Sequence, residues 1–134
     1  MTKHELSKYF YLILEIKDIE RKLEELNNKT IGAIKISDTP FGKTSTDLVS
    51  SQLELIEKYN IKLERKRIKA IEELLKIEEY ISEIKDIETR LIFTKRYIEL
   101  KKWEVIAIEM NMCERAVFKR HSDYLKGEKN VWLF

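Results

Sequence analysis

The sequence predicts an all-α protein in which a long antiparallel, coiled-coil-like helical arm precedes a compact trihelical domain. Only three glycines and one proline occur in the chain, and Gly32, Pro40 and Gly42 fall within one short stretch. Apolar residues recur at helical spacing on both sides of that stretch, and the pattern shortens into three pieces after residue 85. We therefore expect an oligomerisation arm at residues 1–85 and a second domain at residues 86–134.

The first predicted helix begins at the amino terminus and runs to about Asn28. Its opening residues, Thr2-Lys3-His4-Glu5, have the spacing of a capping box, in which the Thr hydroxyl and the Glu carboxylate accept from free backbone N–H groups. A helical stripe of apolar residues follows: Leu6, Tyr9, Ile13, Ile16, Leu23 and Leu26. A polar loop is expected at about residues 29–45.

The second predicted helix, from about Thr46 to Lys85, carries a coiled-coil seam with alternating steps of four and three. The seam residues expected to mediate oligomerisation are Val49, Leu53, Ile56, Leu63, Leu74, Ile77, Ile81 and Ile84. Asn60 and Arg67 also occupy seam positions, where they either fix the register or lie in a wet, splayed part of the bundle. A second stripe is expected to widen the buried face: Ile61, Ile68, Ile71 and Leu75.

Helix lengths predict a homodimer. At the rise of an α-helix the first helix spans roughly 40 Å and the second roughly 60 Å. The first helix therefore cannot cover the whole seam, whose remainder packs on the carboxy-terminal domain or on a second copy of the chain. A second copy is the simpler solution.

The last part of the chain, from Asp86 onward, fits a helix-turn-helix. Such a motif needs a small residue in the middle of its first helix, a residue that accepts a left-handed turn, and a β-branched residue early in its second helix. Ala107, Asn111 and Val117 meet these needs at the right offsets. The residues expected to pack around them are Leu91, Ile92, Tyr97, Ile98, Trp103, Ile106, Met110, Tyr124 and Leu125. Helical phase also places His121 on the inward side of the second helix.

Residues 89–126 resemble the promoter-reading domain of sigma factors, and more closely the phage regulators of the RinA and ArpU type. The matching segments are Arg96-Tyr97, Trp103-Glu104-Val105-Ile106-Ala107 and Glu114-Arg115-Ala116-Val117-Phe118-Lys119. The chain departs from the family pattern at four positions: Asn111 replaces glycine, Lys102 and Cys113 replace capping residues, and Arg120 replaces an apolar residue. The two missing caps should cost each helix about 0.5–2 kcal/mol.

Double-stranded DNA is the predicted partner, bound through the second helix of this motif. Arg115 is expected to read a base, because a guanidinium can pair bidentately with guanine. Glu114 either accepts from cytosine or only favours the helix start, and Phe118 either touches a thymine methyl or packs on residues on the Tyr124 side. The basic residues expected at phosphates, with solvated surface as the alternative for each, are Lys95, Lys101, Lys102, Lys119 and Arg120.

No catalytic, metal or cofactor site is expected. His4 and His121 lie far apart in the chain, and Cys113 has neither a disulfide partner nor the neighbours of a catalytic thiol. The segment "TPFGKTST" lacks the glycine spacing of a phosphate-binding loop. We therefore predict that the protein is not an enzyme.

Charge and hydropathy favour a cytoplasmic protein. Charged residues make up 37% of the 134 residues, yet the formal net charge is only +2. Residues 1–85 carry 16 basic and 16 acidic side chains, whereas residues 86–134 carry 10 and 8, so the excess lies in the predicted DNA-binding domain. No apolar run is long enough for a membrane span or a signal peptide.

The expected function is a phage or prophage transcriptional regulator acting in the bacterial cytoplasm. The family resemblance implies an activator of phage genes that contacts RNA polymerase. Two alternatives remain open: a small terminase-type DNA-packaging subunit, and a coiled-coil adaptor that binds protein rather than DNA.

Overall fold

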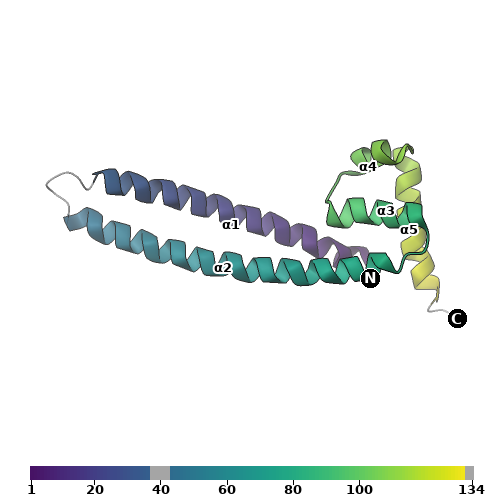
Figure 1. The fold of residues 1–134 in the computed structure, drawn as a ribbon, viewed down its shortest axis with the longest axis horizontal. Coiled ribbons are helices and arrows are strands. Elements are labelled where there is room, and N and C mark those ends of the chain that lie inside the picture. Colours follow the sequence, from purple (N-terminus) through teal and green to yellow (C-terminus); the bar gives the residue numbers. More distant parts are fainter. Residues whose placement is uncertain (37–42, 132–134) are drawn as a thin grey trace. The chain divides into compact units, whose positions relative to one another are not determined.

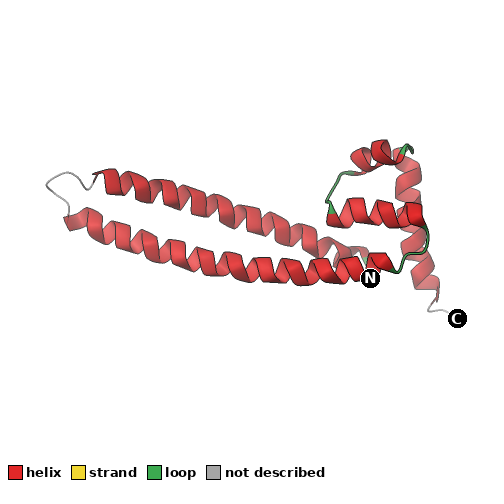
Figure 2. Cartoon of the chain, in the orientation of Figure 1, coloured by secondary structure: helices red, strands yellow, loops and turns green. Residues whose placement is uncertain are grey.

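The predicted all-α class is confirmed by a computed structural model that describes residues 1–36 and 43–131 (Figure 2). These residues form five α-helices and one π-helical segment, and none of them lies in a strand. The elements, labelled in Figure 1 except for η1, are α1 (Lys3–Ile36), α2 (Lys43–Ser82), α3 (Ile87–Phe93), η1 (Thr94–Ile98), α4 (Trp103–Met110) and α5 (Glu114–Val131). Within the described ranges, no helix combines the length and the apolar character needed to cross a membrane.

The first helix begins as predicted but ends later. The Thr2 N–H donates to Glu5 Oε2 and the Glu5 N–H donates to Thr2 Oγ1, both at 3.2 Å, which confirms the capping box. However, α1 continues past Asn28 to Ile36, and α2 already starts at Lys43. Most of the polar loop expected at about 29–45 is therefore helical. Gly32 weakens a helix by only about 1 kcal/mol, which packing can offset; the stretch around Pro40 lies outside the described residues.

The chain divides into two compact units. The first, here called the core unit, consists of Met1–Tyr11 and Ala70–Phe134, and the second, the hairpin unit, is Leu12–Lys69. The predicted division into an oligomerisation arm and a DNA-binding domain at residue 85 stays a prediction. In the structure, residues from both sides of that boundary share one hydrophobic cluster, because Leu6 and Ile77 pack with Phe93.

The hairpin unit is formed by antiparallel stretches of α1 and α2 (Figure 1). Lys66 Nζ of α2 lies 2.5 Å from Glu15 Oε2 of α1, and Thr30 Oγ1 of α1 lies 3.0 Å from Gln52 Oε1 of α2. The apolar residues buried in this unit are Ile16, Ile19, Leu23 and Leu63.

The seam on α2 is mostly covered within the chain, which removes the reason given for a homodimer. In the hairpin unit Leu63 is buried and Val49 and Ile56 are half-buried, although Leu53 stays 52% exposed. In the core unit Leu74 is half-buried, and three further seam residues are buried beside Leu6: Ile77, Ile81 and Ile84. Because α1 is longer than predicted, it reaches positions that were expected to need a second chain.

The prediction that a second stripe on α2 is buried is wrong. Ile61, Ile68, Ile71 and Leu75 are between 48% and 59% exposed. Counted at 100° per residue, they lie roughly 80–160° around α2 from Leu63, so the helix that covers the seam leaves them in solvent. The seam position Arg67 is also exposed, and its guanidinium pairs with Glu20 and Glu64.

The core unit contains two hydrophobic clusters. The first joins residues of α1, α2, the α2–α3 connection, α3 and η1: Leu6, Ile77, Ile81, Ile84, Phe93 and Tyr97, with Tyr124 and Leu125 packed against it. The second joins α3, α4 and α5: Ile92, Ile106, Ala107 and Val117, with Trp103, Met110 and Met112 packed against it. Most residues predicted to support the carboxy-terminal helices are thus inside the core unit.

The segment predicted as one supporting helix after Asp86 is broken in the structure. It forms α3 and then the π-helical η1, where the Glu99 N–H donates to the Thr94 carbonyl at 3.0 Å. Leu91 was expected to be buried but is 43% exposed, whereas Phe93, two positions further on, is completely buried. The predicted inner face of this helix was therefore partly wrong.

Candidate nucleic-acid interface

The connection between α4 and α5 is a tight turn with a left-handed residue. Asn111 has φ 54° and ψ 41°, as predicted, and its backbone N–H donates back to the carbonyl of Ile108 at 3.3 Å. The next N–H, of Met112, donates to the Ala107 carbonyl at 3.0 Å. Asparagine tolerates this conformation better than most residues with a side chain, so no glycine is needed. The turn directs α5 away from α4 within three residues.

The side chains where α4 and α5 meet are the small and branched ones that were predicted. Ala107 is 6% exposed, and Ile106 and Val117 are completely buried in the same cluster. A methyl group at Ala107 lets the α5 backbone approach α4 closely, and Val117 fills the space beside it. The pair of helices therefore shares one buried cluster with Ile92 of α3.

The outward face of α5 carries the residues predicted to read DNA. Glu114, Arg115 and Lys119 are exposed, and neither Arg115 nor Lys119 pairs with an acidic side chain of the described residues. Arg115 and Lys119 line an open depression together with Cys113 and Ala116. These two cations, unpaired among the described residues and one helical turn apart, can contact a polyanion.

The Phe118 ring contacts other side chains of the protein although the residue is 45% exposed. Its ring meets the Trp103 ring edge-on at 5.4 Å between centroids, and Lys3 Nζ lies 5.8 Å from its centroid on the other side. Phe118 therefore packs on Trp103 of α4 while remaining partly exposed, and its contact with a thymine methyl stays a prediction. The position of Lys3 of α1 beside Phe118 was not predicted from the sequence.

Arg120 faces the start of α3. Its guanidinium lies 2.5 Å from Glu88 Oε2 and 3.5 Å from Asp86 Oδ2. Asp86 also caps α3, because it accepts from the Thr89 hydroxyl at 2.6 Å and from the Thr89 N–H at 3.2 Å. These bonds from Thr89, together with the charge of Arg120, hold the pKa of the Asp86 carboxyl below its ordinary value. Contact of Arg120 with phosphate stays a prediction and would compete with this ion pair.

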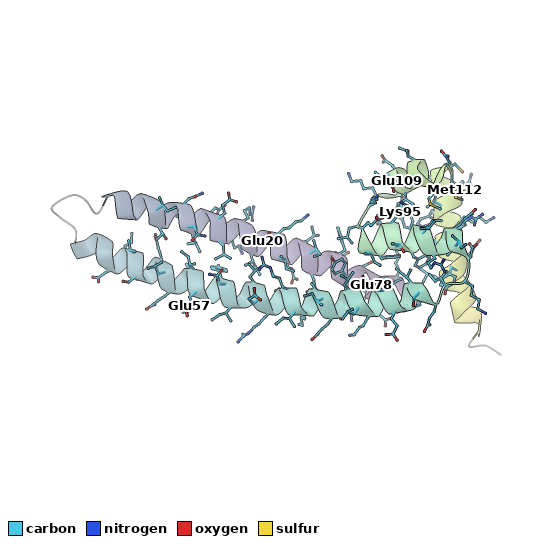
Figure 3. The ribbon with its side chains drawn as sticks, in the orientation of Figure 1. Glu20, Glu57, Glu78, Lys95, Glu109 and Met112 are labelled. Atoms are coloured by element: carbon cyan, nitrogen blue, oxygen red, sulfur yellow. The ribbon has the colours of Figure 1, made fainter. Side chains whose placement is uncertain are left out.

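Two of the lysines predicted to contact phosphate pair with the same carboxylate, that of Glu109. Lys95 Nζ lies 2.8 Å from Glu109 Oε2, and Lys101 Nζ lies 2.7 Å from Glu109 Oε1 and 3.7 Å from Glu99 (Figure 3 labels Lys95 and Glu109). The hydrogen bonds from Lys101 and Lys95 lower the pKa of Glu109, and the bond to Glu109 raises the pKa of Lys101. Lys102 is exposed and has no acidic partner among the described residues. Glu109 therefore partly neutralises Lys95 and Lys101, whereas the charge of Lys102 is not neutralised by a described acidic residue.

His121 lies at the centre of an aromatic cluster that the sequence did not reveal in full. The histidine was predicted to point inward, and it is 1% exposed. Its ring centroid lies 4.8 Å from that of Trp103 and 5.1 Å from that of Phe93, and its Nε2 is hydrogen-bonded to the Tyr97 hydroxyl. Its Nδ1 is buried without a partner. The histidine thus connects α5 to η1.

Burial controls the ionisation of this pair. Desolvation lowers the pKa of His121 from 6.5 to about 4, and the charges of Lys3 and Arg96 act in the same direction. Burial also raises the pKa of the Tyr97 hydroxyl to about 12. At neutral pH both rings are therefore uncharged, which suits a structural contact inside the core unit.

The arrangement can present a short helix face with two free cations to a partner. In the part of the chain that the structure describes, no three His, Cys, Asp or Glu side chains are grouped in a way that could hold a metal ion. A scan against protein-family models and searches of curated proteins and of solved structures return no match.

Proposed function

We propose that the chain is a phage- or prophage-encoded transcriptional regulator that binds double-stranded DNA through α4 and α5 as a helix-turn-helix. The observation that carries the proposal is the geometry of the turn: left-handed Asn111 joins two helices whose contact is made by Ala107 and Val117. This is the spacing expected for that motif. The exposed face of α5 supports it further, since Arg115 and Lys119 are not neutralised by described acidic residues.

On this proposal α5 enters the major groove with its first turns towards the base edges. Arg115, at the second position of α5, would read a base, and Lys119, one turn later, would contact phosphate. Lys102, just before α4, is the third predicted DNA contact that is exposed and has no described acidic partner, and it would contact the flanking backbone. Activation of phage genes with contact to RNA polymerase is proposed on the family resemblance of residues 89–126.

A homodimer remains part of the proposal, but on another face of α2. The seam of α2 is occupied mainly by α1, whereas Ile61 and Ile68, which lie outside the seam in the hairpin unit, are about half exposed. Exposed apolar residues of this size favour association with another apolar surface. Light scattering would distinguish a dimer from the ring expected of a packaging subunit.

Two substitutions on α5 test the DNA-binding proposal after a preferred site is selected from a random DNA pool. Arg115→Ala should weaken binding to the selected site by about 1–3 kcal/mol and change binding to random DNA much less, because it removes a base contact. Lys119→Ala should weaken both alike and reduce the dependence of log affinity on log salt by about one. Binding curves at several salt concentrations measure both effects.

Lys126→Ala is the matched control, because Lys126 is exposed near the other end of α5. It should leave both affinities nearly unchanged. Equal losses of specific and random binding in Arg115→Ala would refute its role as the reading residue. Absence of any sequence enrichment, with the full chain folded, would instead favour the coiled-coil adaptor.

A further inference from the structure

The core unit contains a second feature, a small cavity beside η1, of which the proposed function uses only Lys102. Its volume is about 200 Å³. It lies where the first turns of α1 meet η1 and the connection to α4, and its lining residues are Ser7, Phe10, Arg96, Tyr97, Leu100 and Lys102. All six belong to the core unit.

The walls of the cavity are largely apolar, and one of them is held in an unusual conformation. Phe10, Tyr97 and Leu100 supply the apolar surface. Leu100 has φ 59°, a left-handed value that glycine or asparagine normally occupies. A leucine there costs of order 1–3 kcal/mol in backbone strain. Its side chain is nevertheless present at the cavity, where glycine would leave a gap.

The cavity also has two cations that acidic residues do not neutralise. Arg96 and Lys102 form no ion pair with the described residues, whereas Lys95 and Lys101, their neighbours in the chain, are paired with Glu109. The Arg96 guanidinium is fixed in place, because its Nη1–H donates to the Lys101 carbonyl at 3.1 Å and it stacks on Trp103 at 4.6 Å. Its remaining N–H groups are available to an acceptor.

We propose that this cavity binds a small amphipathic carboxylate, such as an aromatic or short branched acid. The apolar body would lie against Phe10, Tyr97 and Leu100, and the carboxylate would accept from Arg96 and Lys102. The size fits this class, since a cavity of about 150 Å³ suffices for benzene, whereas sites for larger ligands begin at about 300 Å³. Nucleotides are therefore too large. The proposal does not depend on DNA binding.

A bare phosphate would fit the two cations but not the walls. Phosphate has no apolar part, so the surface of Phe10 and Leu100 would stay hydrated or empty around it. An aromatic carboxylate uses both the apolar walls and the two cations of the cavity. Phosphate can use only the cations, and a neutral aromatic alcohol can use only the walls. These two differences define the probes.

Benzoate, benzyl alcohol and inorganic phosphate can be compared on the full chain at constant ionic strength. The variant Trp132→Phe leaves Trp103 as the single tryptophan, and Trp103 reports on the cavity because Arg96 stacks on it. Benzoate should change the fluorescence of Trp103 with saturation. Benzyl alcohol and phosphate should each bind at least about tenfold more weakly, because each lacks one half of the recognition.

Variants of the lining residues locate the binding. Ser7→Leu should abolish the benzoate response by filling the cavity from α1, where leucine is a good helix former. Lys102→Gln should weaken benzoate about three- to tenfold, the effect of a partly exposed charge. Lys126→Gln, an exposed lysine outside the lining, should have no effect. Far-ultraviolet circular dichroism verifies that each variant is folded.

If Ser7→Leu does not fold, Leu100→Gly replaces it, because glycine accepts the left-handed backbone while the wall is lost. That variant should keep its stability and bind benzoate more weakly. A benzoate response without saturation, equal binding of benzoate and benzyl alcohol, or unchanged affinity in Ser7→Leu would each overturn the proposal. Loss of DNA binding in Arg115→Ala with intact benzoate binding would leave it standing.

Discussion

The core unit and the hairpin unit bury apolar surface in different ways. The largest fully buried side chains among the described residues all lie in the core unit: Phe93, Leu6, Ile77, Ile84, Ile92, Ile106, His121 and Val117. In the hairpin unit the buried apolar residues each keep 4–7% exposure. Two helices side by side can bury only one stripe each, whereas several short helices enclose a centre. Packing energy is therefore concentrated in the core unit.

The polar contacts of the two units also differ in how deeply they are buried. The hairpin unit is bridged by partly or fully exposed ion pairs, Lys66 with Glu15 and Arg67 with Glu20. In the core unit the contact between Tyr97 and His121 is buried and uncharged. Salt screens exposed pairs, whereas pH acts on a buried titratable group. The two units should therefore respond to different solution conditions.

The largest effect should come from a cavity in the core unit. Phe93→Ala removes a completely buried ring that packs on Tyr97, His121 and Tyr124, and should lower the free energy of unfolding by about 3–5 kcal/mol. Leu63→Ala in the hairpin unit should lower it by about 2 kcal/mol, at the lower end of such substitutions, because solvent is close by. Urea unfolding followed by circular dichroism measures both. Equal losses would show that the hairpin unit is as tightly packed as the core unit.

An intermediate effect should appear as a dependence of stability on pH. The pKa of His121 falls from 6.5 to about 4 on folding, so the unfolded chain binds a proton more tightly between these values. Above pH 6.5 neither state is protonated and stability is complete. As pH falls from 6.5 to 4, stability should decrease by about 2–3 kcal/mol, with no further loss from this group at lower pH.

His121→Phe should remove this part of the pH dependence, although it leaves the Tyr97 hydroxyl without its partner and so lowers stability at every pH. His4→Gln is the control, since His4 is exposed in the folded chain. Unfolding curves at a series of pH values make the comparison. A slope that survives in His121→Phe would assign the effect to carboxylates instead.

The smallest effect should come from the exposed pairs of the hairpin unit. Arg67→Leu removes the pairs with Glu20 and Glu64 and should change the free energy of unfolding by less than about 1 kcal/mol. The difference from the parent chain should shrink further in high salt. A loss of several kcal/mol would mean that the guanidinium is buried in solution, as it would be at a seam between two copies of the chain.

The sequence alone determined the local features of the carboxy-terminal segment. A left-handed turn needs a residue that adopts positive φ at a low conformational cost. Asn111 was the candidate for this position between the two predicted apolar helices. Ala107, Val117 and His121 were assigned inward from helical periodicity, and each is buried. The capping box at Thr2 was equally predictable, because it depends on two residues three positions apart.

Tertiary structure decided which helix faces are buried and which cations are neutralised, because periodicity along one helix does not contain this information. The apolar stripe that includes Ile61 and Ile68 has helical spacing, but only the position of α1 determines that it faces solvent. Similarly, Lys95 and Lys101 look alike in sequence to Lys102, yet Glu109 neutralises only the first two. Spacing along one helix fixes which residues share a face, whereas burial and charge neutralisation depend on what other segments bring to that face.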